Sequence, residues 1–425
     1  MTRAPQAAPK RGALVGPALT WLATRIGILA LAVVFEFRVA SGDLEYYWQS
    51  ASGSPFAPGT TMLEYPTPTI ALLHGLTLLA HDAHSFAVLF MAVALVADLL
   101  FTAYLALREG GGTRIALGWT LLTFLCGPLL YMRFDVYTAI LLGVALVEYR
   151  RRPALTGAAI ALAVGLKVWP ALTIVAFVGL GWPRFRRIVT GFALTGLVQV
   201  IACVGYAGIP RLLSPLMYQV SRGLNVDSVW ATVPMLWRLR NFDLYPVAVS
   251  AFAAFEVTGP GVSIWLGVAT ASLAIGLLAL LAAAYAAWRR GAGDDVTITG
   301  LVVAATLLLI VSNKTLSPQY LVWLSASVPF LLEALRLRGR PVHAAWALAA
   351  LIAVLTHLTY PLFAGMYTPG TPSLKLILAI LTLATRNVLL LIASGWMLAA
   401  LWRWTRGAGV RQSNGSSSPS GKRTS

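Results

Sequence analysis

Acids and bases occur together in several short stretches of a chain whose other residues are mostly apolar. Asp43 and Glu45 are carboxylates that could accept a proton from a hydroxyl group, which is the role of a general base. Arginine and lysine bind phosphate, arginine through a planar fork and lysine as a point charge. Four cations are therefore candidates for a phosphate site: Lys167, Arg222, Lys314 and Arg133.

Aromatic rings, amides and further acids lie close to these charges in the sequence. Ring faces can stack on the apolar C–H patches of a sugar, while carboxylates and amides can bind its hydroxyl groups. The candidate substrate-binding residues are Tyr46, Tyr47, Tyr65, Asp135, Trp169, Asp227, Trp230, Asn313, Gln319, Tyr320 and His357.

The rest of the chain is too apolar for a water-soluble protein. Its 425 residues are 58% hydrophobic and 11% charged, whereas soluble domains carry about 25% charged residues. The net charge of +17 does not indicate nucleic acid, because the basic residues form short clusters between apolar runs, as in membrane proteins. We expect a lipid bilayer as partner. The two cysteines match no metal or redox spacing, and no dense carboxylate cluster is present, so we predict no metal and no cofactor.

The apolar runs predict an all-α polytopic membrane protein. A transmembrane helix needs about 20 mostly apolar residues, and about 12 segments meet or approach this length. They are 15–37, 86–107, 115–131, 135–150, 153–167, 169–182, 188–206, 262–288, 296–312, 319–335, 342–358 and 376–402. The apolar segment 66–80 is short and follows Tyr65-Pro66-Thr67-Pro68, so we expect an amphipathic interfacial helix there, in the first outer loop.

Clusters of arginine and lysine indicate the orientation of these spans. When the N-terminus is placed in the cytoplasm, every cytoplasmic segment carries basic residues, and most acids fall on the outer side, as the positive-inside rule requires. We therefore predict a multi-pass protein of the cell membrane with both termini in the cytoplasm. The expected regions are a basic N-terminus at 1–14, a transmembrane domain at 15–402 and a disordered cytoplasmic tail at 403–425.

This topology places the candidate residues at the outer face of the membrane. Polar groups near the bilayer are costly and usually line a cavity, so we expect one outer cavity with Asp43 at its rim. A lipid-linked sugar phosphate fits such a cavity, because its tail lies in the bilayer, its phosphate at the boundary and its sugar above.

Each feature also has a simpler interpretation. Asp43 and Glu45 could be solvated loop acids, and Arg133 could pair with Asp135 across the end of a span. Lys167 could extend to the interface, and the aromatic residues could form an interfacial belt. A histidine near a helix end, such as His357, is often a packing residue. Charged residues deeper in the spans could form structural ion pairs or a proton relay: Asp98, Arg25 and Arg386.

The order of the polar motifs resembles glycosyltransferase family 87 of actinobacteria. That family has the type C glycosyltransferase fold and includes polyprenol-phosphate-mannose-dependent mannosyltransferases. The matching pieces cover nearly the whole chain: Asp43-x-x-Tyr46-Tyr47, Gly53-x-Pro55-Phe56, Tyr65-Pro66-x-Pro68, Arg133-Phe134-Asp135, Lys167-x-x-Pro170, Arg222-Gly223, Ser228-Val229-Trp230, and Asn313-Lys314-x-x-Ser317-Pro318-Gln319-Tyr320 with Trp323.

The resemblance implies transfer of a sugar, with mannose expected, from a polyprenyl-phosphate donor to a glycolipid or glycan acceptor at the outer face. Asp43 matches the family's catalytic carboxylate by its place in the first outer loop, and Glu45 is a second candidate. Arg133 is expected to orient Asp135. Mannosyltransferases that extend phosphatidylinositol mannosides carry a histidine pair where this chain reads Ser317-Pro318-Gln319-Tyr320, and His357 is a candidate replacement.

Two other classes of function fit an apolar chain of this kind. A transporter or flippase of lipid-linked sugars would use the charged residues inside the spans, and such proteins often have internal repeats and a site at the midplane. A non-catalytic membrane scaffold would leave the outer polar residues far apart. The absence of a visible repeat and the gathering of polar residues at one face favour the glycosyltransferase.

Overall fold

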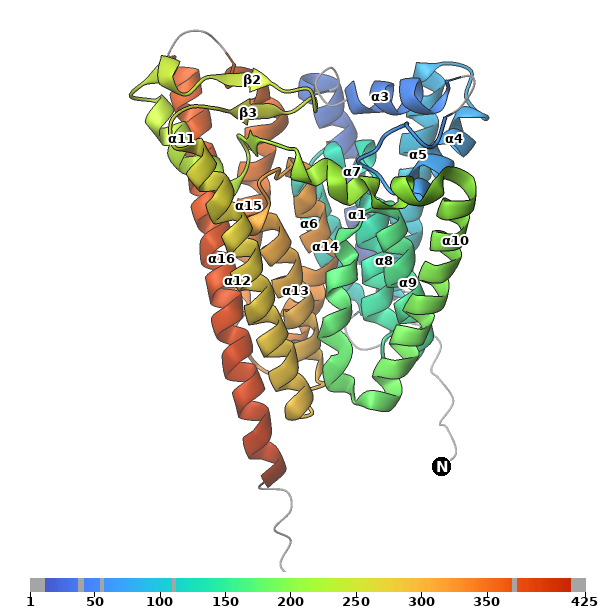
Figure 1. Ribbon diagram of the computed structural model, residues 1–425. Helices are drawn as coiled ribbons and strands as arrows, with labels where there is room; N and C mark the ends of the chain where they lie inside the picture. The colour runs from blue at the N-terminus through green and yellow to red at the C-terminus, as the bar shows by residue number, and fades with distance from the viewer. Residues whose placement is uncertain (1–11, 37–41, 54–56, 109–111, 369–372, 414–425) are drawn as a thin grey trace, which may run out of the picture.

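The computed structural model describes residues 12–36, 42–53, 57–108, 112–368 and 373–413, and most of them belong to helices that run along a common direction (Figure 1). Among these residues, eight helices are long and apolar enough to cross a membrane. They are α1 (Gly12–Leu31, extended by η1, Ala32–Glu36), α5 (Ala83–Ala106), α10 (Trp182–Val220), α12 (Val262–Arg289), α13 (Asp295–Ser312), α14 (Leu321–Leu337, preceded by η5, Pro318–Tyr320), α15 (His343–His357, extended by η6, Leu358–Leu362) and α16 (Leu374–Ser413). The chain is therefore a multi-pass, helical membrane protein, as predicted.

Four shorter helices coincide with the remaining predicted segments. They are α6 (Gly112–Leu125), α8 (Asp135–Glu148), α9 (Pro153–Leu166) and the 3₁₀ helix η2 (Trp169–Leu180). A 14-residue α-helix such as α8 is about 21 Å long, which is less than the hydrocarbon thickness of about 30 Å. Ten of the 14 residues of α8 are buried, whereas only 11% of the most apolar window of α12 is buried. The interior of the bundle holds α8 together with the long helices α13 and α14, whose most apolar windows are 83% buried, and helices such as α10 and α12 surround them.

Close backbone contact holds α9 against α10. A Cβ atom on Gly157 would lie 1.9 Å from the Ile188 carbonyl oxygen, and one on Gly191 would lie 2.0 Å from the Ala154 carbonyl oxygen. Small residues let membrane helices approach in this way, where dispersion contacts replace the hydrophobic driving force. These glycines set the distance between the two helices.

One end of the bundle, which we call the α3 end, carries the elements that do not span. They are α3 (Gly42–Ala51), α4 (Thr67–Thr77), α7 (Leu129–Met132), η3 (Val229–Ala231), α11 (Thr232–Arg238), η4 (Phe242–Leu244), η7 (Ala364–Met366), and the strands β1 (Leu224–Asn225), β2 (Val247–Val249) and β3 (Phe255–Val257). The helix expected at 66–80 is present as α4, whose 11 residues are too few to span a bilayer.

A small antiparallel sheet at the α3 end was not predicted. Its strand order is β1-β3-β2, and Val257 of β3 pairs with Leu224 on one side and Val247 on the other. The strands have only two or three residues each, which is too short for an alternating pattern to be recognised in the sequence.

Gly208 divides α10 into two parts. Its φ of +81° is a conformation that residues with a side chain rarely adopt, and Pro210 follows closely. The predicted span 188–206 ends directly before this glycine, and the second part of the helix turns across the α3 end (Figure 1).

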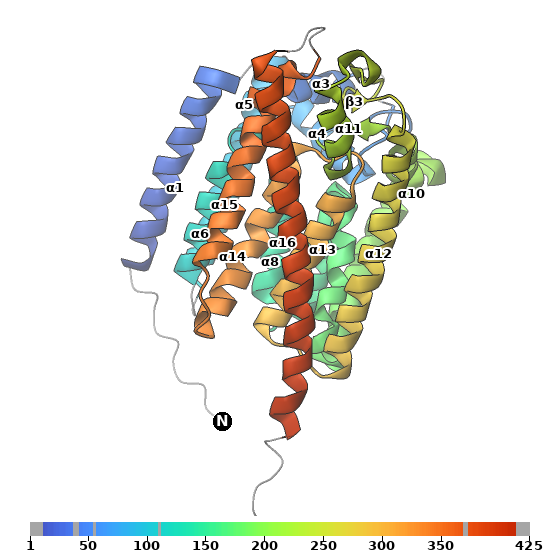
Figure 2. The ribbon, with the colours of Figure 1, turned by 90° about the vertical axis from the view of Figure 1, so that its left-hand side faces the viewer.

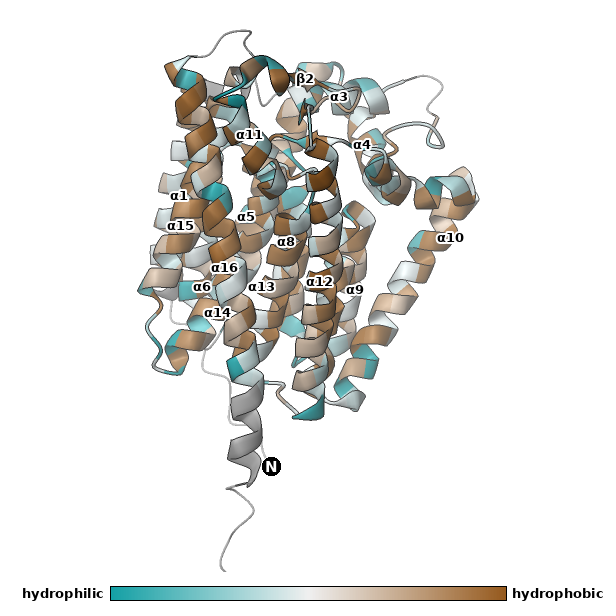
Figure 3. Ribbon diagram, turned by 60° about the vertical axis from the view of Figure 1, so that its left-hand side comes forward, coloured by the Kyte–Doolittle hydropathy of each residue, from teal (hydrophilic) through white to brown (hydrophobic). Residues whose placement is uncertain are grey.

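The opposite end of the bundle, which we call the arginine end, gathers basic residues from several turns. The first described residues of α1 and the last of α16 also lie at this end (Figure 2). Figure 3 shows hydrophobic helix shafts with hydrophilic residues toward both ends. One expectation about this end is corrected: α16 continues to Ser413, so 403–413 is helical although Gly407 and Gly409 lie within it. The rest of the predicted tail and most of the predicted N-terminal region lie outside the described residues.

The α9–α10 contact gives a stability test. We expect Gly191→Ala to lower the free energy of unfolding by about 1–3 kcal/mol, because the added methyl group overpacks against backbone. Gly196→Ala on the same helix is the matched control, since a Cβ there meets nothing within 4 Å. Thermal unfolding of the purified protein in detergent measures both. Equal melting temperatures for the two variants would contradict the proposed contact.

Candidate functional site

The side chains of Asp43 and Arg133 form a salt bridge at the α3 end. Asp43 lies in the first turn of α3, and Arg133 directly follows α7. The Arg133 side chain is 4% exposed and that of Asp43 is 44% exposed. Burial alone would lower the pKa of the guanidinium, but the Asp43 carboxylate raises it above its ordinary value, so Arg133 stays charged. The buried Arg133 guanidinium thus binds the Asp43 carboxylate, which remains partly exposed.

The partner of Arg133 differs from the one expected. Arg133 was predicted to orient Asp135, yet the carboxylate in its salt bridge is Asp43. Arg133 has an extended backbone at the end of α7, whereas Asp135 is already the first residue of α8. The two residues therefore do not share a helix face, and the role of Arg133 in orienting Asp135 stays a prediction.

Aromatic rings surround the Asp43–Arg133 pair. The hydroxyl groups of Tyr47 and Tyr65 are 3.0 Å apart, and the Tyr47 ring centroid is 5.1 Å from that of Phe134. Burial raises the pKa of both tyrosines. Tyr47 is almost fully buried, so it forms the wall behind the pair. Tyr46 is more exposed and donates a hydrogen bond of 2.7 Å to Glu64.

Asp135 belongs to a second charged pair. Its carboxylate oxygens accept hydrogen bonds of 2.7 and 2.9 Å from the Lys167 ammonium and one of 2.5 Å from the Trp323 indole. Asp135 begins α8 and Lys167 ends α9, so the antiparallel pairing of these helices brings the two residues together. The Lys167 charge is matched by that of Asp135, which limits its availability for a phosphate.

Three stacked rings lie against this pair. The Trp323 ring centroid is 4.4 Å from that of Trp169 and 4.1 Å from that of Tyr320. The Lys167 ammonium lies 4.9 Å from the Tyr320 ring centroid and 5.6 Å from the Trp323 centroid, within the range of cation–π attraction. Three of the sequence candidates thus form one cluster with Asp135: Lys167, Trp169 and Tyr320.

Arg222 and Lys314 lie close to one acid, Glu256. The Arg222 Nε atom is 3.7 Å from a Glu256 carboxylate oxygen, and the Lys314 ammonium donates a 3.0 Å hydrogen bond to the Val220 carbonyl. Burial lowers the pKa of Lys314, and the charge of Glu256 partly opposes this effect. Two cations and one carboxylate leave this group with a net positive charge.

Asp227 is buried in a fourth group of polar residues. Its carboxylate is 3.1 Å from the Arg386 guanidinium, which also donates to the Thr359 hydroxyl at 3.1 Å. Burial raises the pKa of Asp227, and Arg386 opposes this effect. Asn387 donates to the Ser228 carbonyl at 3.2 Å. This network joins the loop after β1 to α16, so the structure gives Asp227 and Arg386 a structural role.

The charged groups share one face of the bundle. Tyr46 of α3 lies near Tyr218, and the Arg222 guanidinium lies 5.8 Å from the Tyr218 ring centroid. Within η6, Tyr360 lies beside Arg133 and Thr359 binds Arg386. The residues predicted to meet at one face are therefore brought to the α3 end, although as four separate groups. An open cavity among them remains a prediction.

The remaining candidates have local roles. Glu45 is exposed and accepts a 2.7 Å hydrogen bond from Gln49 one helical turn away. The Asn313 side-chain oxygen accepts from the Thr315 amide at 2.9 Å and from its hydroxyl group at 2.8 Å. Gln319 is half-buried in η5. His357 packs against the turn at Gly127, where a Cβ atom would lie 2.1 Å from its ring.

Asp98 is the centre of a buried polar cluster inside the bundle. Its carboxylate accepts hydrogen bonds from Arg25 at 2.8 and 2.9 Å, from Trp21 and Trp119 at 2.7 Å, and from Tyr131 at 2.8 Å. Both charges of the ion pair are almost completely buried. The ion pair expected between Asp98 and Arg25 is therefore present.

Arg211 is a buried residue that sequence reasoning missed. It donates to backbone carbonyls of the first loop, including those of Pro58 at 2.9 Å, Met62 at 3.1 Å and Tyr65 at 2.7 Å. These bonds attach the loop that follows α3 to the second part of α10. The sequence carries no signal for this contact, because its partners are main-chain atoms.

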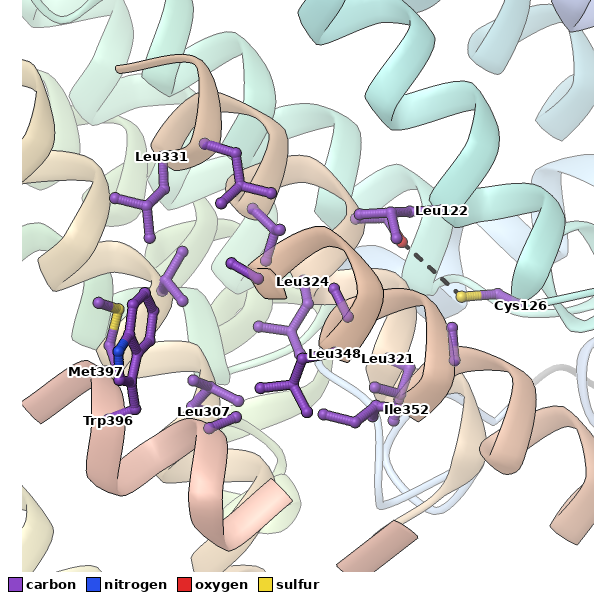
Figure 4. Close-up of a pocket in the computed structure, with 18 residues that line it drawn as sticks. Leu122, Cys126, Leu307, Leu321, Leu324, Leu331, Leu348, Ile352, Trp396 and Met397 are labelled. Atoms are coloured by element: carbon purple, nitrogen blue, oxygen red, sulfur yellow. Dashed lines mark hydrogen bonds between the residues drawn. The ribbon is translucent and has the colours of Figure 1, made fainter. Parts of the chain in front are cut away.

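Two apolar hollows lie between the helices. The first, about 80 Å³ in volume, is lined by residues of α6, α13, α14, α15 and α16 (Figure 4). Cys126 lies at its wall, 3.8 Å from the Ser325 hydroxyl, as a buried residue. The second, about 290 Å³, lies between α12, α13 and α16 and is lined by Trp230 and Ser312 toward the α3 end. The Trp230 indole nitrogen is buried and has no hydrogen-bond partner in the described part of the chain.

The described residues contain no group of three or more histidine, cysteine, aspartate or glutamate residues able to hold a metal. Comparisons of the chain with protein-family models, with curated proteins and with solved structures find no match in any of the three. The resemblance to glycosyltransferase family 87 therefore rests on the motifs and stays a prediction.

The Asp135–Lys167 pair can be tested by a double-mutant cycle. We expect Asp135→Ala and Lys167→Ala each to lower the free energy of unfolding by about 3 kcal/mol, because each leaves one buried charge without its partner. The double variant should lose clearly less than the sum, since neither charge remains. Thermal unfolding in detergent measures the cycle, and strictly additive losses would contradict the pairing.

Proposed function

We propose that the protein is a membrane glycosyltransferase that moves a sugar, with mannose expected, from a polyprenyl-phosphate donor to a lipid or glycan acceptor at the α3 end. The observation that carries the proposal is Asp43, a half-exposed carboxylate held by the buried Arg133. A general base must be accessible to its substrate and correctly oriented, and this pair meets both requirements. Glu45 is less suitable as the base. Its hydrogen-bond partner is Gln49, an exposed residue of the same helix, which does not fix the carboxylate as a buried arginine does.

In the proposed reaction, the acceptor hydroxyl attacks the anomeric carbon of the donor sugar. The bond from that carbon to the acceptor oxygen forms, and the bond to the phosphate oxygen breaks. The hydroxyl proton passes to the Asp43 carboxylate, and polyprenyl phosphate leaves with the bonding electrons. Arg133 orients Asp43 through their salt bridge.

The leaving phosphate gains negative charge, so cations near it stabilise the transition state. We assign this role to Arg222 and Lys314, because their group carries a net positive charge and Lys314 binds only a carbonyl oxygen among the described atoms. Arg133 and Lys167 were also expected at the phosphate, but each already binds a carboxylate. We assign them to positioning Asp43 and Asp135.

The hollow below Trp230 suits the apolar tail of such a donor. It is lined by Ser312, two residues before Lys314, so a tail in the hollow would place its phosphate near that ammonium group. The mostly aliphatic lining between α12, α13 and α16 matches a hydrocarbon chain by the hydrophobic effect.

The proposal includes the finer topology. In it, α6, α8, α9 and η2 cross the bilayer together with the eight long helices, as in the type C glycosyltransferase fold. The α3 end faces outward, and the arginine end faces the cytoplasm. An even number of crossings agrees with the two described chain ends lying at one end of the bundle (Figure 2).

Transport of a lipid-linked sugar is less well supported. The transport hypothesis was suggested by charged residues inside the spans. In the structure these residues form ion pairs: Asp98 with Arg25, and Arg386 with Asp227. Each of these charges is thus already neutralised by a partner within the protein.

The catalytic assignment is tested with membranes that contain the full-length protein, polyprenyl-phosphate mannose and lipid acceptors. We expect Asp43→Asn to reduce the rate of sugar transfer by about 10²–10⁴-fold, because the amide cannot accept the proton. Glu45→Gln, on the same helix, is the matched control and should retain most of the activity. Mass analysis of the lipid products measures the transfer.

Full turnover by both Asp43→Asn and Asp43→Ala would rule out Asp43 as the base. Loss of activity in Glu45→Gln, with Asp43→Asn active, would move the role to Glu45. If the wild-type protein transfers no sugar from any polyprenyl-phosphate donor, the proposed function itself is wrong.

A further inference from the structure

The arginine end contains a hollow of about 680 Å³, within the size range of small-molecule binding sites. Six arginines from five segments line it: Arg150, Arg184, Arg290, Arg338, Arg340 and Arg403. The lining contains a single acid, Asp294. The hollow lies at the opposite end of the bundle from the candidate active site.

Only two of these arginines have a carboxylate partner among the described residues. Arg338 lies 2.8 Å from Asp294, and Arg150 binds Asp295 beside the hollow. Arg184, Arg290, Arg340 and Arg403 have no acid within salt-bridge distance in the described ranges. Four cations that face one hollow repel one another, so this arrangement is relieved when an anion binds between them.

The hollow is built on a close contact of two main-chain segments. A Cβ atom on Gly293 would lie 2.4 Å from the Gly179 carbonyl oxygen, and one on Gly179 would lie 2.7 Å from the Ala292 carbonyl oxygen. The turn between α12 and α13 is thus packed against the end of η2. Asp294 caps α13 by accepting hydrogen bonds of 3.1 Å from the Val296 and Thr297 amides, so that carboxylate is already engaged.

Exposed tryptophans place the hollow at the membrane boundary. Trp182 begins α10, Trp288 lies in the last turn of α12, and Trp402 precedes the lining residue Arg403. All three side chains are exposed, and tryptophan is enriched at the headgroup level of membranes. The arginines therefore lie at the depth of lipid phosphates.

We infer that this hollow binds the phosphate group of an anionic phospholipid from the leaflet at the arginine end. Arginine binds phosphate oxygens through two parallel N–H groups, and four arginines that lack acidic partners surround the hollow. The neighbouring helices α10 and α12 are largely exposed to lipid, so an acyl chain can lie beside them while the headgroup enters. The inference is independent of the proposed glycosyl transfer.

A general preference for basic residues on one side of the membrane explains how many arginines lie at this end, but not why six of them line one hollow. The rule concerns loops near span ends and is satisfied by arginines that point anywhere on that side. Arg186 and Arg187 are such residues, because they are exposed at the start of α10 but do not line the hollow. They supply a matched control of equal charge.

The test compares the full-length double variants Arg290→Gln/Arg340→Gln and Arg186→Gln/Arg187→Gln. Native mass spectrometry measures phosphatidylglycerol bound to each protein from mixed micelles, with phosphatidylcholine as the zwitterionic reference. We expect the hollow variant to lose about thirty-fold in affinity for phosphatidylglycerol, since each arginine near an anionic lipid contributes roughly five-fold. The control variant should lose much less.

A second arm separates a lipid headgroup from free phosphate. We expect inorganic phosphate to raise the melting temperature of the wild-type protein much less than phosphatidylglycerol does. Equal losses in the two double variants would overturn the site, because they would indicate diffuse surface charge. If the wild-type protein shows no preference for phosphatidylglycerol over phosphatidylcholine, or if free phosphate stabilises it equally well, the lipid assignment is wrong. The comparisons of phosphatidylglycerol with phosphatidylcholine and with free phosphate use the wild-type protein, so they test the proposal even if a variant fails to fold.

Discussion

A charge inside an apolar bundle must be neutralised by a partner, and Asp98 shows how far this constraint reaches. Its carboxylate binds side chains from α1, α6 and α7, so one buried acid fixes three elements around α5. Tyr131 is among these partners, and Arg133 lies two residues farther along the chain. The neutralisation of Asp98 therefore also positions the arginine that holds Asp43.

The same constraint divides the molecule into two chemically different ends. At the α3 end, acids and bases are present in similar numbers and bind one another, which leaves oriented carboxylates. At the arginine end, cations exceed acids, which leaves positive charge without partners. The apolar shafts between them keep the two ends separate (Figure 3). A polar reaction and a lipid contact can thus occur in one protein without sharing residues.

The features predicted from the sequence are those that depend on neighbouring residues. The apolar runs gave the positions of the helices, and Gly208 ends a span where the apolar run ends. The grouping of Asp43, Arg133, Asp135 and Lys167 at one end followed from counting spans. Their pairing did not, because Arg133 and Asp43 are far apart in the sequence and meet only because α3 and α7 both pack against α5. The sheet at β3 and the Arg211 contacts were missed for the same reason, since both are long-range main-chain interactions.

The shortness of α8 and α9 has a consequence for the depth of the charged residues at their ends. Both begin or end at the arginine end through the turn at Arg150, and their 14 residues stop well below the level reached by the 28 residues of α12. Asp135 and Lys167 therefore lie about 21 Å along the helix axis from the turn at Arg150, a distance shorter than the hydrocarbon thickness of about 30 Å. Because other helices enclose α8, this shorter layer consists of packed protein and not of lipid. A lipid-anchored molecule could then meet ionised groups without being lifted out of its leaflet.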